Sequence, residues 1–181
     1  MGHDITVTQL PSARETLVLT CTYPSTPPSA LFPYWTQPGL LCQWWPKVAE
    51  IEPVMGGRYH LAWPGANWHL RGQYTSFDIG KQLVFTWVWD HEPDDTTTVA
   101  VAFLPLPIGG TQLMLTQGPY ASSEAGQTRR QGHIDGWRHF LGALAALQQQ
   151  SNPDRDWSHE TNDDDIDGSS FDTETWRHSH G

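Results

Sequence analysis

Hydrophobic and polar residues alternate along the middle of the chain, which is the pattern of β-strands with one buried face. In Gln82–Asp90 the large apolar side chains Leu83, Phe85, Trp87 and Trp89 share one phase of the alternation. Four other segments repeat this pattern: Gly57–Trp63, Trp68–Tyr74, Thr96–Leu104 and Thr111–Gln117. A further strand is predicted at Glu15–Tyr23, where β-branched residues are frequent.

Turn-forming residues separate the later strands, at Pro64-Gly65, Gly80-Lys81, Pro93-Asp94-Asp95 and Gly109-Gly110. Strands joined by such short connections pair antiparallel. One face of the strands is strongly apolar and the other is mixed. We therefore expect an antiparallel sheet that packs against another element on one side only.

The periodicity changes to that of a helix between Glu124 and Gln150, where Ile134, Trp137, Leu141 and Leu144 recur at helical spacing. A helix of this length extends about 40 Å, enough to cross the whole sheet. Two shorter helices are predicted at Ser29–Trp35 and Pro38–Trp45, after a proline-rich break. The predicted fold class is α+β.

Three glycines, Gly132, Gly136 and Gly142, lie inside the long predicted helix. Each costs about 1 kcal/mol relative to alanine in a helix interior. Close approach of the helix to the sheet or to a ligand would offset this cost. Alternatively, Gly132 lies in a frayed first turn and costs little.

The chain divides into three parts. Residues 1–14 are expected to form an N-terminal arm, with a short strand at Ile5–Val7, and residues 15–150 form the folded domain. Residues 151–181 lack hydrophobic periodicity and carry nine acidic residues and two arginines, so we predict a disordered acidic tail. The formal net charge of −10 argues against a nucleic-acid or anionic-membrane partner, since both favour clustered Lys and Arg.

Cysteine usage and the apolar runs bear on the cellular compartment. With only Cys21 and Cys42, reduced thiols are favoured over a disulfide framework. We find neither a signal-peptide pattern nor a membrane-spanning run of about 18 apolar residues. The sequence therefore predicts a cytoplasmic protein.

Six short motifs occur in an order that resembles a known family. They are the stretch from Thr16 to Lys47, Gly56-Gly57-Arg58-Tyr59, Gly72-Gln73-Tyr74, Leu83-Val84-Phe85-Thr86-Trp87, Gly109-Gly110-Thr111-Gln112-Leu113 and His133-Ile134-Asp135-Gly136-Trp137. Together they cover about three-quarters of the chain and are similar to the activators of the Hsp90 ATPase, within the START/Bet v 1-like (SRPBCC) superfamily. Many relatives carry histidine at the position of Gln117.

The resemblance implies a helix-grip fold, in which a curved antiparallel sheet surrounds a long C-terminal helix and encloses a cavity. Relatives include hydrophobic-ligand binders, co-chaperones and polyketide cyclases. We therefore expect a small hydrophobic molecule in the cavity. The alternatives are an Hsp90-type co-chaperone that binds a chaperone through its outer surface, and a cyclase-like enzyme. We expect no cofactor and no metal.

The predicted ligand-binding residues are mostly aromatic: Trp45, Trp63, Trp68, Tyr74, Phe85, Trp87, Trp89, Trp137 and Leu141. Flat rings offer apolar walls, and indole and phenol groups can orient a guest. The alternative is that these rings simply fill the core. The segment Trp44-Trp45-Pro46 has two possible roles, a lid over the cavity mouth or a cap on the sheet edge, and the sequence favours neither.

One histidine is a candidate acid or base. His133 lies one helical turn before Trp137, so it could reach the cavity, whereas His60 and His69 fall on the polar phase of their strands. We find no nucleophile elbow, phosphate loop or HExxH pattern. Catalysis would therefore depend on His133, and a binding role is favoured over an enzymatic one.

The tail contains one motif of its own. From Asp163 to Glu174, oxygen-bearing residues and Gly168 follow the spacing of an EF-hand calcium loop. The flanking segments do not have the pattern of amphipathic helices, and Ser170 replaces the usual apolar residue. An acidic solubilising tail is favoured over a calcium site.

Overall fold

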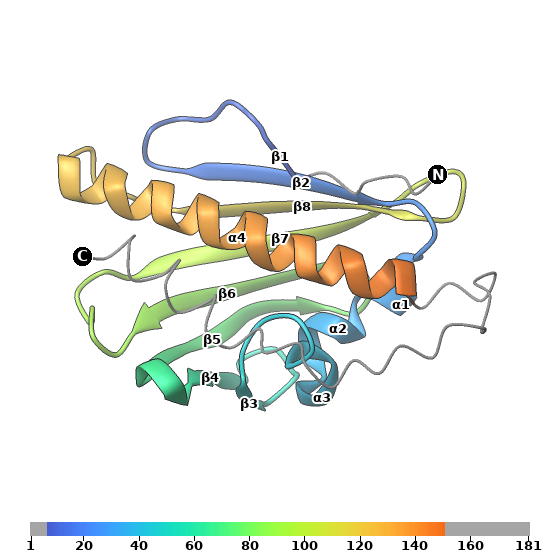
Figure 1. The fold of residues 1–181 in the computed structure, drawn as a ribbon, viewed down its shortest axis with the longest axis horizontal. Coiled ribbons are helices and arrows are strands. Elements are labelled where there is room, and N and C mark those ends of the chain that lie inside the picture. The colour runs from blue at the N-terminus through green and yellow to red at the C-terminus, as the bar shows by residue number, and fades with distance from the viewer. Residues whose placement is uncertain (1–6, 151–181) are drawn as a thin grey trace.

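The computed structural model describes residues 7–150. Its eight strands form one antiparallel sheet in the order β1-β2-β8-β7-β6-β5-β4-β3 (Figure 1). The strands are β1 (Val7–Gln9), β2 (Leu17–Tyr23), β3 (Val48–Ile51), β4 (Arg58–Trp63), β5 (Trp68–Asp78), β6 (Gln82–Trp89), β7 (Thr97–Pro105) and β8 (Thr111–Gly118). The helices are α1 (Pro28–Leu31), α2 (Pro33–Thr36), α3 (Pro38–Leu41), the 3₁₀ turn η1 (Pro64–Ala66) and α4 (Glu124–Gln150).

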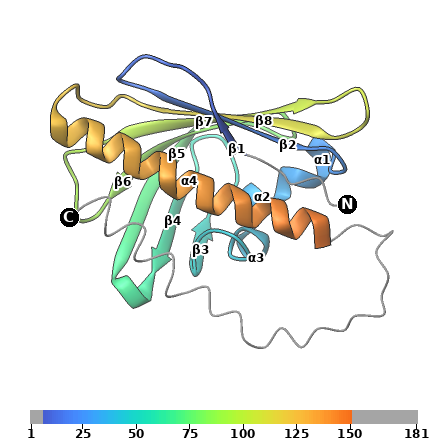
Figure 2. The same cartoon turned by 45° about the horizontal axis from the view of Figure 1, so that its top comes forward.

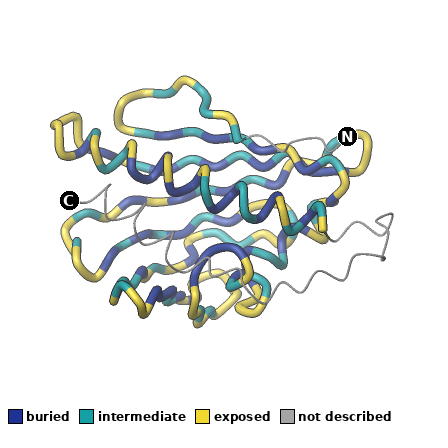
Figure 3. Tube along the Cα trace, in the orientation of Figure 1, coloured by how far each residue is buried: buried dark blue, intermediate teal, exposed yellow. Residues whose placement is uncertain are grey.

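The predicted strand connections are confirmed. Gly80 joins β5 to β6 and Gly109 joins β7 to β8, with φ angles of 75° and 98° that favour glycine over side-chain-bearing residues. Burial alternates along the strands as the sequence pattern predicts (Figure 3). In β6, for example, Leu83, Phe85 and Trp87 are buried, and the residues between them are less so.

The long helix α4 lies across the inner face of the curved sheet, which confirms the predicted helix-grip arrangement (Figures 1 and 2). Ile134, Trp137, Leu141 and Leu144 are at most 1% exposed, so the predicted helical stripe is its buried face. Figure 2 shows the sheet curling around this helix, with α1–α3 near its C-terminal half. The core therefore lies between one helix and one sheet.

Polar contacts fix both ends of α4. Near its N-terminus, Arg129 forms ion pairs with Glu92 (3.1 Å) and Asp95 (2.9 Å) in the β6–β7 connection. Near its C-terminus, Thr26 Oγ1 donates a hydrogen bond to Gln148 Oε1 at 3.2 Å. These contacts set the helix across the strands and limit its sliding.

The short elements depart from the predicted pattern in detail. The segment predicted as one helix at Ser29–Trp35 is divided into α1 and α2, because Pro33 begins a new helix at the end of the first. Two edge strands were not predicted at their observed positions. The N-terminal strand is Val7–Gln9 where the sequence predicts Ile5–Val7, and no strand is predicted at β3 (Val48–Ile51).

The glycines of α4 differ in their surroundings. Gly132 and Gly136 are buried, in agreement with close packing. A Cβ atom added to Gly142 would have no atom within 4 Å outside the helix backbone, so close approach does not explain glycine there. Both cysteines, Cys21 and Cys42, are free thiols. None of the helices within residues 7–150 is long and apolar enough to cross a membrane.

Candidate functional site

Tryptophan rings fill the space between the sheet and α4. Trp45 stacks on Trp87 with ring centroids 5.7 Å apart and lies 4.9 Å from Trp137. Trp35 stacks on Trp137 at 5.9 Å and lies 6.3 Å from Trp45. Rings from α2, the end of α3, β6 and α4 therefore form one continuous aromatic cluster, whose contacts stabilise each pair beyond simple burial.

The predicted ligand-binding residues all lie in or beside this core. Eight of them are at most 4% exposed: Trp45, Trp63, Tyr74, Phe85, Trp87, Trp89, Trp137 and Leu141. The ninth, Trp68, is half-buried and packs against Trp89 and His91. Several rings thus fill the core, which was the alternative interpretation.

A small hollow remains on the inner face of the sheet. It has a volume of about 10 Å³, room for roughly one water molecule. It is lined by Trp35, Leu41, Trp45, Ile51, Tyr59, Leu61, Tyr74 and Phe85. Trp45, Tyr74 and Phe85 of the predicted set are on its wall, whereas Trp63, Trp87, Trp89, Trp137 and Leu141 pack beside it.

Two donors on this wall lack acceptors. The indole N–H groups of Trp35 and Trp45 are buried and have no hydrogen-bond partner among the described residues. Leaving a buried donor unpaired costs about 1–3 kcal/mol. A partner carrying an acceptor oxygen would recover this cost, so the hollow suits a group with a carbonyl, carboxylate or hydroxyl.

The short helices close the hollow from one side. Trp44 Nε1 donates to the carbonyl of Tyr34 at 2.9 Å, which holds the end of α3 to α2. Trp63 Nε1 donates to the carbonyl of Trp45 at 3.1 Å, which ties this segment to β4. Trp45 packs into the aromatic core against Trp63, Trp87 and Trp137, which is compatible with both interpretations of Trp44-Trp45-Pro46.

Tyr59 forms the opposite wall and closes a break in the sheet. Strands β5 and β6 pair at Arg71–Val88 and again at Tyr74–Phe85, but the residues between these two pairs are not paired with each other. Tyr59 Oη donates to the carbonyl of Thr86 at 2.5 Å, and the Gln73 N–H donates to Thr86 Oγ1 at 2.9 Å. Side chains therefore satisfy the backbone groups that this break leaves unpaired.

Gly72 makes room for the Tyr59 ring. A Cβ atom at Gly72 would overlap the carbonyl oxygen of Thr86 and lie 2.5 Å from Tyr59 Cε1. The ring thus lies over a residue without a side chain, between the inner hollow and the outer face. Burial raises the pKa of the Tyr59 hydroxyl well above its ordinary value, so this group is a neutral donor.

His133, the candidate acid or base, is buried within the grip. Its Nδ1 lies 2.6 Å from Tyr120 Oη, and its ring contacts Trp87. Burial raises the pKa of Tyr120, so the phenol stays protonated and can donate to the imidazole. His133 is not on the wall of the inner hollow.

Gln117 anchors the central tryptophan of α4. Its Oε1 accepts a hydrogen bond from Trp137 Nε1 at 2.8 Å, and its Nε2 donates to Thr97 Oγ1 at 2.9 Å. All three residues are at most 3% exposed. Gln117 thus occupies a structural position rather than that of a base.

A family comparison identifies the group to which this fold belongs. The model of the Activator of Hsp90 ATPase homolog 1-like protein family matches residues 25–149, well over half of the chain. The chain belongs to this family. The match confirms the resemblance carried by the six sequence motifs, and the observed sheet and helix confirm its fold.

Solved structures of other family-like proteins are similar in fold. Protein MLL2253 from Mesorhizobium loti is 26% identical, with a TM-score of 0.66, and the match covers 76% of this chain and 98% of that one. An HSP90 activator from Plasmodium falciparum is 24% identical, with a TM-score of 0.61 and coverage of 75% and 96%. CalU16 from Micromonospora echinospora is 15% identical, with a TM-score of 0.57 and 98% of both chains covered. A comparison with curated proteins finds no match.

Several wall residues were missed by sequence reasoning. Tyr59 and Leu61 stand in phase in the predicted strand Gly57–Trp63, so alternation alone could have placed them on the inner face. Trp35 and Leu41 lie in helices too short to show a helical period. Their place on the wall depends on the path of the chain between β2 and β3.

Within residues 7–150, no group of three or more His, Cys, Asp or Glu side chains could hold a metal ion. The predicted calcium-like loop from Asp163 to Glu174, and the whole predicted tail 151–181, lie outside the described residues.

Proposed function

We propose that this protein binds a small, flat, apolar molecule bearing a hydrogen-bond acceptor, in the hollow between the sheet and α2–α3. The observation that carries this proposal is the pair of unpartnered indole N–H groups of Trp35 and Trp45 on the wall of that hollow. The surrounding rings supply apolar surface for the guest, and the two donors orient its polar atom. No cofactor is needed for this role.

Binding requires the hollow to widen, because about 10 Å³ admits only a water-sized group. Of the elements around the hollow, α1–α3 have the least regular structure, since each of these three helices has four residues. Helices this short have little stability of their own. We expect α2 and α3 to move outward with Trp35 and Trp45, which then face the guest from the lid side.

The first test is a titration of the full chain with 1-anilinonaphthalene-8-sulfonate, an aromatic probe that carries acceptor oxygens. We expect saturable quenching of tryptophan emission with a matching rise in probe emission. Trp45→Phe keeps a ring but removes the donor, and should weaken binding by about tenfold, the equivalent of one hydrogen bond. Trp68→Phe is the matched control, because Trp68 is half-buried and not on the wall of the hollow.

The outcomes separate the proposed roles. Equal probe affinity in wild type, Trp35→Phe and Trp45→Phe would exclude this hollow as the site. Native mass spectrometry of the purified protein adds a second readout, in which a bound compound lost on mild unfolding supports the proposal. Failure of all probes together with enrichment of Hsp90 in a pull-down would instead favour the co-chaperone role.

A further inference from the structure

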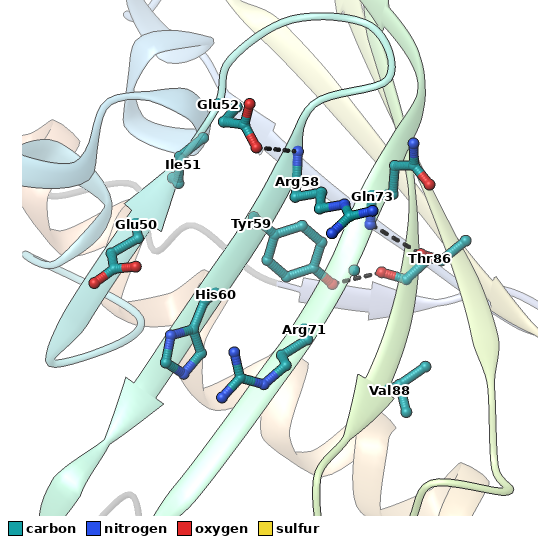
Figure 4. A pocket seen from close by; sticks show the side chains of 11 residues that line it. Glu50, Ile51, Glu52, Arg58, Tyr59, His60, Arg71, Gln73, Thr86 and Val88 are labelled. Carbon is teal, nitrogen blue, oxygen red and sulfur yellow. Dashed lines mark hydrogen bonds between the residues drawn. The ribbon is translucent and has the colours of Figure 1, made fainter.

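The outer face of the sheet contains a groove of about 660 Å³ on the side opposite α4 (Figure 4). Residues of β3, β4, β5 and β6 and the loop after β3 line it: Glu50, Ile51, Glu52, Arg58, Tyr59, His60, Arg71, Gly72, Gln73, Thr86 and Val88. The groove lies over the part of the sheet where β5 and β6 lack paired residues, between Arg71 and Tyr74.

The arginines of the groove have unused hydrogen-bonding capacity. Asp90 accepts only the Nε–H of Arg71, at 3.0 and 3.3 Å, so both Nη groups of Arg71 lack a partner among the described residues. The guanidinium of Arg58 also has no such partner, since only its backbone N–H bonds to Glu52. Figure 4 shows the guanidinium of Arg71 directed toward His60, and that of Arg58 beside Gln73.

His60 provides a third polar group at the Arg71 end. Its backbone pairs with Arg71 across β4 and β5, and its Nε2 lies 2.8 Å from His69 Nδ1. His69 Nε2 lies 3.3 Å from the side-chain oxygen of Asn67, which can only accept. This arrangement fits a His69 tautomer that donates from Nε2 and accepts at Nδ1 from His60 Nε2.

Charges of both signs surround His60. Burial lowers the pKa of His60, Arg71 and His69 lower it further, and Glu50 and Asp90 act in the opposite direction. Asp90 is already paired with Arg71. The carboxylates of Glu50 and Glu52 are confined to β3 and the loop after it, on one side of the groove. They disfavour a ligand with negative charge along the whole groove but leave the Arg71 end open to one small oxyanion.

We propose that this outer groove binds a small oxyanion, a carboxylate or a phosphate monoester, on the free Nη groups of Arg71 beside His60. The planar guanidinium offers two parallel N–H groups that match two oxygens of such an anion. The site lies on the opposite face from the inner hollow, and the observations that support it do not include the guest proposed there.

Histidine NMR tests this site directly. Wild-type protein is titrated with inorganic phosphate and, separately, with acetate at constant ionic strength, while the His60 ring signal is followed. Because a nearby anion stabilises the imidazolium, we expect a saturable shift of this signal and a higher pH midpoint for His60. Saturation by phosphate alone or by acetate alone identifies the class of anion.

Matched variants decide the assignment. Arg71→Ala should weaken anion binding at least about tenfold, because the paired N–H donors are lost. Arg71→Lys keeps the positive charge but loses the two parallel N–H groups. Its anion affinity should lie between those of the wild type and Arg71→Ala. Arg138→Ala is the control, since Arg138 is exposed on α4, away from the groove. A linear shift without saturation for both anions, or equal affinity in Arg71→Ala with an unchanged near-ultraviolet circular dichroism spectrum, overturns the proposal.

Discussion

At the residue scale, the contact between Gly72 and Tyr59 shows how one absent side chain determines a local structure. The Tyr59 ring crosses Gly72 and donates to Thr86, which restores a hydrogen bond that the β5–β6 ladder lacks. Alternation predicted the inward phase of Tyr59, but not this bond. The sequence shows a glycine at position 72, but its role in making room for the Tyr59 ring depends on how the neighbouring strands pack.

Gly72→Ala should therefore lower the free energy of unfolding by about 3 kcal/mol or more, at the upper end of the cost of overpacking. The added methyl group overlaps the backbone oxygen of Thr86 as well as the Tyr59 ring. Shortening Tyr59 in a Tyr59→Ala, Gly72→Ala double variant should consequently fail to restore stability. Urea unfolding measures both, with Gly65→Ala as the control, since a Cβ there has no atom within 4 Å.

Gln117 offers a second test at this scale. Gln117→Leu leaves Trp137 Nε1 without its acceptor and Thr97 without its donor, so we expect a loss of about 2–3 kcal/mol. Chemical unfolding followed by tryptophan emission measures it. Gln112→Leu, on the opposite phase of the same strand, is the comparison. Equal stability of the two variants would show that the buried network contributes little.

At the element scale, long elements were predictable and short ones were not. The helix α4 carries a stripe of apolar residues over many turns, and every strand except β1 and β3 has six or more residues, so periodicity is visible in both. The segment from Pro28 to Leu41 folds into three four-residue helices whose placement depends on packing. Trp35, an essential part of the proposed wall, lies in that segment.

The helix itself contains one improvable position. Gly142 is helical, and a Cβ atom there would meet no neighbour within 4 Å. Gly142→Ala should raise the free energy of unfolding by about 0.5–1 kcal/mol, because alanine restricts the unfolded chain and favours the helix. Urea unfolding provides the measurement. A decrease in stability would mean that the glycine serves a contact or motion absent from this conformation.

At the scale of the whole molecule, the architecture followed from sequence pattern and family resemblance, while the site followed only in part. The apolar face of the sheet and the apolar stripe of the long helix must each be buried against another element, so their packing on one another could be inferred. Whether aromatic rings such as Trp87 and Trp137 line a cavity or fill it depends on rotamers and ring contacts. Pattern alone does not specify these.

Alkaline stability is a property of the whole core. Burial raises the pKa values of Tyr23, Tyr59, Tyr74 and Tyr120 above their ordinary value. The thiol pKa values of Cys21 and Cys42 are raised by the same cause. Groups whose pKa is raised in the folded state stabilise it fully below their unfolded pKa, and this contribution is lost as the pH rises toward the folded value.

We therefore expect the urea midpoint to fall as the pH rises above about 9, first through the thiols and then through the phenols. Tyrosinate absorbance should increase together with the loss of near-ultraviolet circular dichroism. Ionisation of the buried phenols in a chain that keeps its tertiary signal would contradict this prediction.

The Tyr59 ring has a further consequence, because it borders both the inner hollow and the outer groove. A molecule that shifts this ring from one side alters the shape offered to a molecule on the other side. Thermodynamic reciprocity then requires each occupant to change the affinity of the other by the same factor, whichever binds first. A single phenol could thus couple two unlike ligands across one layer of β-structure.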